Sequence, residues 1–278
     1  MRAIWNWPRF DLERDAWIAA RPGGAVVGYA WVWGPRRPHA DYDGFLGLEP
    51  ADSQPGVGEA LLERLEARAL AAAEDAGLAG RVAVVVWSSS RDAVKRELLE
   101  ARGFAQVRTY YRMERLLDGP FESPRWPDEV RVSVFRRGVD DAELHDTLQE
   151  AFARHYRFMV EPLDEWSRRA LDREEFAPEL TFLVLHRDRA VAASCNYHMG
   201  QDGWVGILGV RDAWRHRGLA TALLWHSFRA FQAVGARRAC LGVDGENADN
   251  APRLYERVGM RVTRHVHLYE KTLRPAAG

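Results

Sequence analysis

The stretch Gly206-Ile-Leu-Gly-Val-Arg-Asp-Ala-Trp-Arg-His-Arg-Gly-Leu-Ala-Thr-Ala-Leu-Leu-Trp-His226 changes its hydrophobic period in the middle. Residues up to Val210 form a short apolar run, which is typical of a buried strand. From Gly218 onward, apolar residues recur at the three- and four-residue spacing of a helix, at Leu223, Leu224, Phe228, Phe231 and Val234. We therefore predict a buried strand that passes through a tight turn into a buried helix.

The turn between the two elements, Arg215-His-Arg-Gly-Leu-Ala220, suits an anion. Gly218 and the small Ala220 let a ligand approach the backbone, and the first N–H groups of a helix have no partner within it. The peptide dipoles add partial positive charge, and Arg215 and Arg217 add formal charge. The pattern predicts a phosphate or pyrophosphate site. The alternative is a tight turn that needs glycine and binds nothing.

This turn resembles the acetyl-CoA pyrophosphate loop of GNAT-type N-acetyltransferases. The pattern of that loop is Gln or Arg, two residues, Gly, one residue, and Gly or Ala, which Arg215, Gly218 and Ala220 match. A second family motif has a counterpart downstream, where the apolar run 239–244 precedes Asn247 and the short helical segment 251–258. The two motifs occur in the family's order.

The resemblance implies a fold, a reaction and a set of residues. The fold would be α/β with a mixed sheet, and an acceptor amine would attack the thioester of acetyl-CoA directly. Backbone groups of Leu208, Gly209 and Val210 would pair with the pantetheine arm, and the Val210 N–H would stabilise the oxyanion. The other residues implied for binding acetyl-CoA are Arg215, His216, Arg217, Gly218, Leu219, Ala220, Thr221, Asn247, Ala251 and Tyr255.

The resemblance also implies that Tyr255 protonates the leaving CoA thiolate. A phenol suits this role because it keeps its proton at neutral pH; the alternative is that Tyr255 only fills the core beside Leu254. A general base would take the proton of the acceptor amine, and each residue considered for it could equally be a solvated loop residue. These residues are Glu161, His198 and Asp244.

The chain contains a tandem duplication. The matched segments are residues 25–29 with 190–194 at an offset of 165, 56–58 with 218–220 at 162, and 99–117 with 255–273 at 156. We therefore predict a degenerate, N-terminally trimmed GNAT-like domain over 1–118, a Pro-rich linker over 119–129, and a complete, catalytic GNAT domain over 130–278. This layout is similar to that of two-domain acetyltransferases of the mycothiol synthase type.

The first copy differs from the second where chemistry is expected. Ser53, Arg91 and Leu99 stand in place of Arg215, Asn247 and Tyr255, and leucine cannot donate a proton. We expect the first copy to be structural or regulatory. Its opening strand and helices have almost no room before residue 25, so either the true start lies upstream or this copy is trimmed. A trimmed copy would expose apolar sheet surface, and a homodimer is one way to cover that surface.

Composition narrows the function classes. A net charge of −1 leaves no basic surface for nucleic acid, and no apolar run is long enough to span a membrane. The two cysteines, Cys195 and Cys240, lie in strand-like runs without metal-ligand spacing, so we expect no metal and a cytoplasmic location.

Two functions remain open. One is acetyl transfer to a small amine, and the other is a non-catalytic acyl-CoA-binding module. Aromatic residues hint at an acceptor pocket, although such residues are more often core; they are Tyr156, Phe158, Trp166 and Trp204. In enzymes of the mycothiol synthase type a glutamate early in the strand before the loop is the expected base, and Trp204 occupies that place.

Overall fold

The structure is a computed structural model that describes residues 7, 9–36, 40–49, 56–247 and 250–276. Its contacts divide the chain into two units. The first unit contains residues 1–110 and 264–278, and the second contains residues 111–263. Strands β5 (Ala105–Leu116) and β11 (Arg261–Arg274) each contribute residues to both units.

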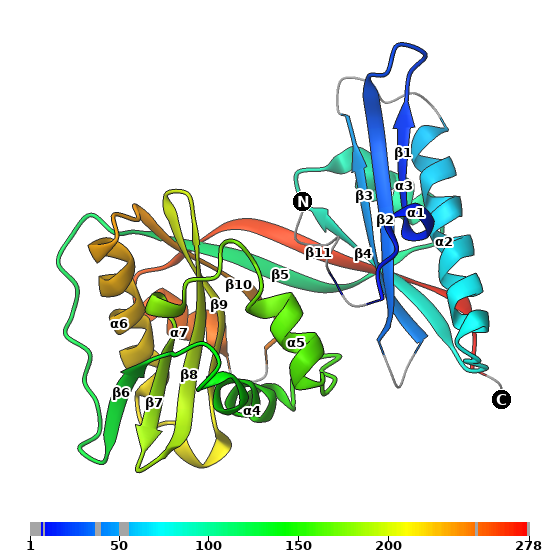
Figure 1. Cartoon of the computed structure of the whole chain (residues 1–278). Helices are drawn as coiled ribbons and strands as arrows, with labels where there is room; N and C mark the ends of the chain where they lie inside the picture. Colours follow the sequence, from blue (N-terminus) through cyan, green and yellow to red (C-terminus); the bar gives the residue numbers. More distant parts are fainter. Residues whose placement is uncertain (1–6, 8, 37–39, 50–55, 248–249, 277–278) are drawn as a thin grey trace. The chain divides into compact units, whose positions relative to one another are not determined.

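The first unit has a mixed sheet with strand order β1-β2-β3-β4-β11. Its elements are α1 (Leu12–Asp15), β1 (Ala16–Ala20), β2 (Val26–Arg36), β3 (Ala40–Leu48), α2 (Val57–Asp75), β4 (Val82–Ser89) and α3 (Ala93–Ala101). Helix α2 connects β3 to the parallel β4 and packs along one face of the strands (Figure 1). Leu62 and Leu65 of α2 meet Val84 and Val86, alternate residues of β4, in the core.

The second unit has the strand order β6-β7-β8-β9-β10-β5. Its elements are β6 (Val130–Val134), α4 (Asp141–Phe152), α5 (Leu163–Ala170), β7 (Phe182–His186), β8 (Arg189–Met199), β9 (Asp202–Val210), α6 (Leu219–Ala233), β10 (Arg238–Asp244) and α7 (Ala251–Arg257). Two short 3₁₀ turns, η3 (Pro178–Leu180) and η4 (Asp212–Trp214), lie before β7 and α6. Apolar clusters form on both faces of this sheet, two with α6 and one with α4 and α5. The predicted α/β fold with a mixed sheet is confirmed.

The order of elements is the same twice. The series β1, β2, β3, α2, β4, α3, β5 is followed by β7, β8, β9, α6, β10, α7, β11. In the described part of the first unit, no element stands in the place of β6, α4 or α5. The trimmed start of the first copy stays a prediction.

Strand register corrects one detail of the duplication. At an offset of 162, Leu46 of β3 corresponds to Leu208 of β9. Leu46 pairs with Ala30, and Leu208 pairs with Ser194. The hairpins therefore match at an offset of 164 and not 165. A one-residue slip matters because it moves every side chain of a strand to the other face.

The last strand departs from the predicted division at residue 130. Residues 264–274 of β11 belong to the first unit, where they pair antiparallel with β4. Tyr269 is buried in the first unit's core, and Lys271 bonds to Glu66 at 2.8 Å. Arg81 of the same unit pairs with Glu270. These contacts explain why the segment joins the first unit although it follows the second copy in sequence.

None of the helices that the structure describes combines the length and apolar character needed to cross a membrane.

Candidate functional site

Strand β9 carries a bulge at Gly206. Ile207 pairs with Cys195 of β8, whereas Val205 pairs with Asn196, so Gly206 is the extra residue. On its other edge β9 pairs in parallel with β10, and this pairing ends at Val205 and Leu241. From the bulge onward, no described strand pairs with that edge of β9. The backbone of Leu208, Gly209 and Val210 thus lies beside the gap between two diverging strands.

Close packing requires glycine at the bulge. A Cβ at Gly206 would overlap the ring of Tyr197 and lie 3.1 Å from the Cys195 carbonyl oxygen. Tyr197 is buried, and its ring faces the Arg173 guanidinium at 4.9 Å and the edge of Phe176. The Tyr197 ring therefore holds the β9 backbone at the point where it leaves β10. No pattern in the sequence indicates this role of Tyr197.

We expect Gly206→Ala to lower the unfolding temperature by about 2–10 °C, because the added methyl overlaps the buried Tyr197 ring and overpacking of this kind costs about 1–3 kcal/mol. The matched control is Gly242→Ala on the neighbouring strand β10, where a Cβ would meet nothing within 4 Å. Thermal unfolding followed by circular dichroism measures both variants. Equal unfolding temperatures for the two would contradict the close packing of Tyr197 on the bulge.

The turn before α6 has the geometry of an anion site. Gly218 is the N-cap residue, with φ 80° and ψ −2°, and His216 has φ 61°. No side chain among the described residues caps the first turn of α6, and a Cβ at Gly218 would meet nothing within 4 Å. The first N–H groups of α6 therefore have no side-chain cap, and the helix dipole favours negative charge beside them. Leu219 is buried below the turn, whereas Ala220 and Thr221 are partly exposed.

The two arginines of the turn are engaged by protein groups. Arg215 donates to the Ala151 carbonyl at 2.9 Å and pairs with Asp212 at 3.0 Å. Arg217 lies over the Trp214 ring at 4.6 Å and bonds to Glu129. The positive potential at this turn thus comes from the backbone N–H groups more than from the charges of Arg215 and Arg217, on which the sequence-based prediction relied.

Helix α7 carries Tyr255 and contacts β10. Tyr255, Ala251 and Leu208 pack against one apolar cluster that includes Leu224 and Val243. Burial raises the pKa of Tyr255 to about 12, so the phenol keeps its proton at neutral pH. The structure therefore places a neutral phenol and the side chain of Leu208 against the same apolar cluster.

Asn247 has a structural contact of its own. Its Oδ1 accepts the Ala251 N–H at 3.4 Å, at the start of α7, and Asn250 before that helix is left-handed with φ 56°. The Asn247 side chain thus helps to begin the helix that carries Tyr255. A part in acetyl-CoA binding would come in addition to this contact.

The three residues considered as the base lie in different places. Both carboxylate oxygens of Glu161 accept from Arg169, at 2.7–3.2 Å, in the segment between α4 and α5. His198 lies near the end of β8, where its backbone N–H donates to Glu175. Asp244 ends β10, three residues beyond the last pair with β9, and its Oδ1 accepts the Glu246 N–H at 2.9 Å. Asp244 alone of the three lies on a strand that borders the gap.

The aromatic residues do not form one wall. Trp166 is almost fully buried in the core under α4 and α5, where its ring meets His145 edge-on. Tyr156 is exposed, and Trp204 lies under the Arg112 guanidinium at 5.1 Å. The hint of an aromatic pocket is therefore wrong for Trp166, because a large apolar ring on α5 fills the core.

Arg211 is a residue that the sequence analysis missed. It directly follows β9 and is 6% exposed. Its guanidinium donates to the Ala190 carbonyl at 2.7 Å and to Thr147 at 3.1 Å, and it pairs with Glu150. These bonds hold the end of β9 between β8 and α4. A lone arginine after a strand gives no signal of such burial.

Comparison with known proteins identifies the family of this chain. The profile of the acetyltransferase (GNAT) family matches residues 143–260, which contain the gap, the α6 turn and Tyr255. The chain belongs to the GNAT acetyltransferase family and is an N-acetyltransferase.

Among its relatives, mycothiol acetyltransferase of Kineococcus radiotolerans is 32% identical over 268 residues, covering 90% of this chain and 83% of the relative. Mycothiol acetyltransferase of Geodermatophilus obscurus is 30% identical over 261 residues, covering 89% and 79%.

Two solved structures share the fold. A GCN5-related N-acetyltransferase from Sphaerobacter thermophilus has a TM-score of 0.82 and 28% identity, covering 99% of this chain and 86% of that one. A tandem GNAT protein from the clavulanic acid biosynthesis pathway has a TM-score of 0.73 and 12% identity, covering 99% and 88%.

Proposed function

We propose that the second unit transfers an acetyl group from acetyl-CoA to a primary amine of a small molecule by direct attack on the thioester. The observation that carries this proposal is the edge of β9 beyond the Gly206 bulge. The pairing of β9 with β10 has ended there, and no described strand takes its place. An extended pantetheine arm carries amide groups that can pair with such an edge as a strand would.

Each part of acetyl-CoA has a chemically suitable partner. The pyrophosphate would take the N–H groups at the α6 turn, where Gly218 leaves the backbone open. Leu208, Gly209 and Val210 would pair with the pantetheine arm. The Val210 N–H would donate to the thioester oxygen and stabilise the negative charge that develops on it.

The proton transfers divide between two side chains. The amine nitrogen bonds to the thioester carbon and loses a proton, and the C–S bond then breaks to release the thiolate. Tyr255 donates its phenolic proton to that thiolate. We assign the base to Asp244, because it ends β10 and borders the gap, whereas Glu161 lies in the segment between α4 and α5. Trp204 cannot take up a proton, and the carboxylate of Asp202, at the start of β9, is engaged by Arg238.

Thiol release tests the proposed function. The enzyme is incubated with acetyl-CoA and a panel of amines that includes amino sugars, aminoglycosides and a cysteinyl amino-sugar conjugate. The last of these is chosen because the relatives carry the name mycothiol acetyltransferase. We expect amine-dependent release of CoA with at least one member. Binding of acetyl-CoA without release for any amine would favour the non-catalytic acyl-CoA-binding module.

A further inference from the structure

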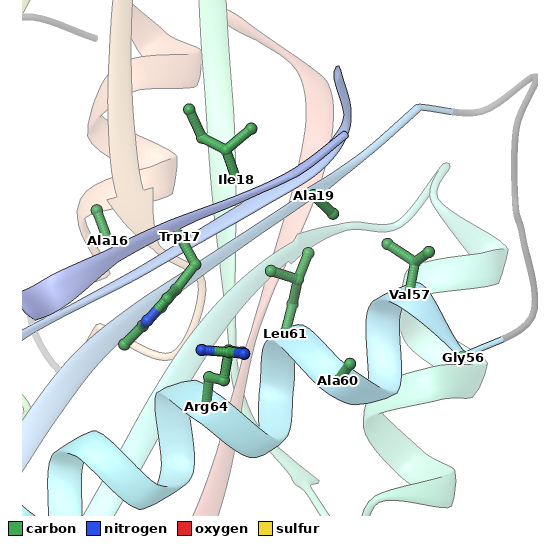
Figure 2. Close-up of a pocket in the computed structure, with 9 residues that line it drawn as sticks. All are labelled: Ala16, Trp17, Ile18, Ala19, Gly56, Val57, Ala60, Leu61 and Arg64. Carbon is green, nitrogen blue, oxygen red and sulfur yellow. The ribbon is translucent and has the colours of Figure 1, made fainter. Parts of the chain in front are cut away.

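The first unit has an open strand edge with a cavity beside it. Strand β1 ends the strand order, and among the described residues only β2 pairs with it. A cavity of about 690 Å³ lies between β1 and the start of α2. Figure 2 shows Trp17 and Ala19 turned toward α2, with Ala19 near Val57 and Trp17 near Arg64, while Ile18 points away from the helix.

In the second unit, a further strand pairs with the edge that corresponds to β1. Its counterpart of β1 is β7, and β6 pairs antiparallel along the outer edge of β7 from Val130 to Val134. Val130 and Val132 of β6 pack against the cluster that contains Leu219 and Leu223 of α6. A strand on this edge thus fills the space beside the helix with alternate side chains, and the described part of the first unit contains no such strand.

The chemistry of β1 favours strand pairing. Its sequence, Ala-Trp-Ile-Ala-Ala, carries no charge, and Ile18 is 70% exposed. Edge strands that stay unpaired are usually protected by charged side chains or proline. The edge strand β6 of the second unit carries Arg131, whereas β1 has no such residue.

The strand is also complementary to itself. In an antiparallel pair of β1 strands centred on Ile18, Trp17 of each copy lies opposite Ala19 of the other. A large side chain then meets a small one on the α2 face, twice, and no like charges meet. Trp17 of one copy would lie over Ala19 of the other, next to the cavity at Val57 and Ala60.

We propose that the outer edge of β1 pairs with β1 of a second copy of this chain across a twofold axis, with each Trp17 opposite Ala19 of its partner. Isologous contacts of this kind close at two copies. The contact is small, so we expect a dimer with a dissociation constant of about 1–100 µM, as for weak interfaces.

Sedimentation velocity over a concentration series tests this interface. We expect wild type to form dimers, and Ile18→Lys to raise the dissociation constant at least about tenfold, because it places two like charges opposite each other. The control is Val134→Lys, an exposed apolar residue on the other edge strand, which should leave the dimer unchanged. Circular dichroism checks that both variants are folded.

A cross-link provides a second test, which does not depend on weakening the dimer. Ile18→Cys should form an intermolecular disulfide under mild oxidation, because opposed residues of paired strands have Cβ atoms about 4.5–5.5 Å apart. The natural cysteines, Cys195 and Cys240, are buried and should not cross-link. A monomeric wild type at 100 µM, or a dimer equally sensitive to Ile18→Lys and Val134→Lys, would overturn the proposal.

Discussion

Replacing Tyr255 by phenylalanine is expected to lower kcat roughly 10- to 1000-fold, while acetyl-CoA affinity changes by less than about twofold. The variant keeps the ring that packs with Leu208 and Leu254 and removes only the hydroxyl. The thiolate then leaves without a proton donor, which costs free energy in the transition state and little in the ground state. Steady-state kinetics and an acetyl-CoA titration measure the two quantities.

The raised pKa of Tyr255 also predicts how kcat depends on pH. Because burial raises it to about 12, the phenol remains protonated throughout the neutral range. The kcat of wild type should therefore show no loss below about pH 10 from Tyr255 ionisation. The control for the substitution is Tyr111→Phe, which removes another phenol hydroxyl beside the same apolar cluster and should leave kcat unchanged. Equal kcat values for Tyr255→Phe and wild type would reduce Tyr255 to a core residue.

Replacing Gly218 by aspartate should weaken acetyl-CoA binding at least about 30-fold, or about 2 kcal/mol, because a carboxylate would face the pyrophosphate. Space is not the reason, since a Cβ there would meet nothing within 4 Å. Backbone strain contributes as well, because φ is 80° and Asp tolerates this region less well than Gly.

A matched variant separates charge from strain. Gly218→Asn has the size of Asp, tolerates positive φ and carries no charge, so we expect it to bind several-fold more weakly than wild type but more tightly than Gly218→Asp. Isothermal titration calorimetry gives the three affinities. If both variants bind acetyl-CoA as tightly as wild type, the pyrophosphate does not lie at this turn.

Several features of the fold follow from local sequence signals. The change of period after Val210 predicts the end of β9 and the start of α6, because side chains on one face recur at different spacings in strands and helices. The turn before α6 depends on the backbone conformation of Gly218 alone, so the glycine is enough to predict the turn from the sequence. The doubled order of elements follows from the duplication.

Other features depend on contacts between residues far apart in sequence. Residues 264–274 resemble the end of the first copy, yet their place in the first unit depends on Tyr269 and on ion pairs with Glu66 and Arg81. The bulge at Gly206 depends on the ring of Tyr197 on the neighbouring strand. Glu161 looks like a free carboxylate until the fold places Arg169 against it. The residue pattern of one chain segment does not show which distant residues will contact it.

Gly56 and Gly218 occupy matching positions in the two units. The same substitution at each glycine therefore tests the central claim that the second unit performs acetyl transfer. Gly56 is the N-cap of α2 with φ 93° and, like Gly218, has nothing within 4 Å of an added Cβ. Aspartate therefore adds similar strain and the same charge at either site, and thermal unfolding shows whether both variants are folded.

Amine-dependent CoA release by Gly56→Asp and Gly218→Asp, compared with wild type in one experiment, is the most direct measurement. The account predicts turnover within a few-fold of wild type for Gly56→Asp and a loss of at least about 30-fold in kcat/KM for Gly218→Asp. Turnover abolished by Gly56→Asp and retained by Gly218→Asp, with both proteins folded, would place catalysis in the first unit and contradict the account.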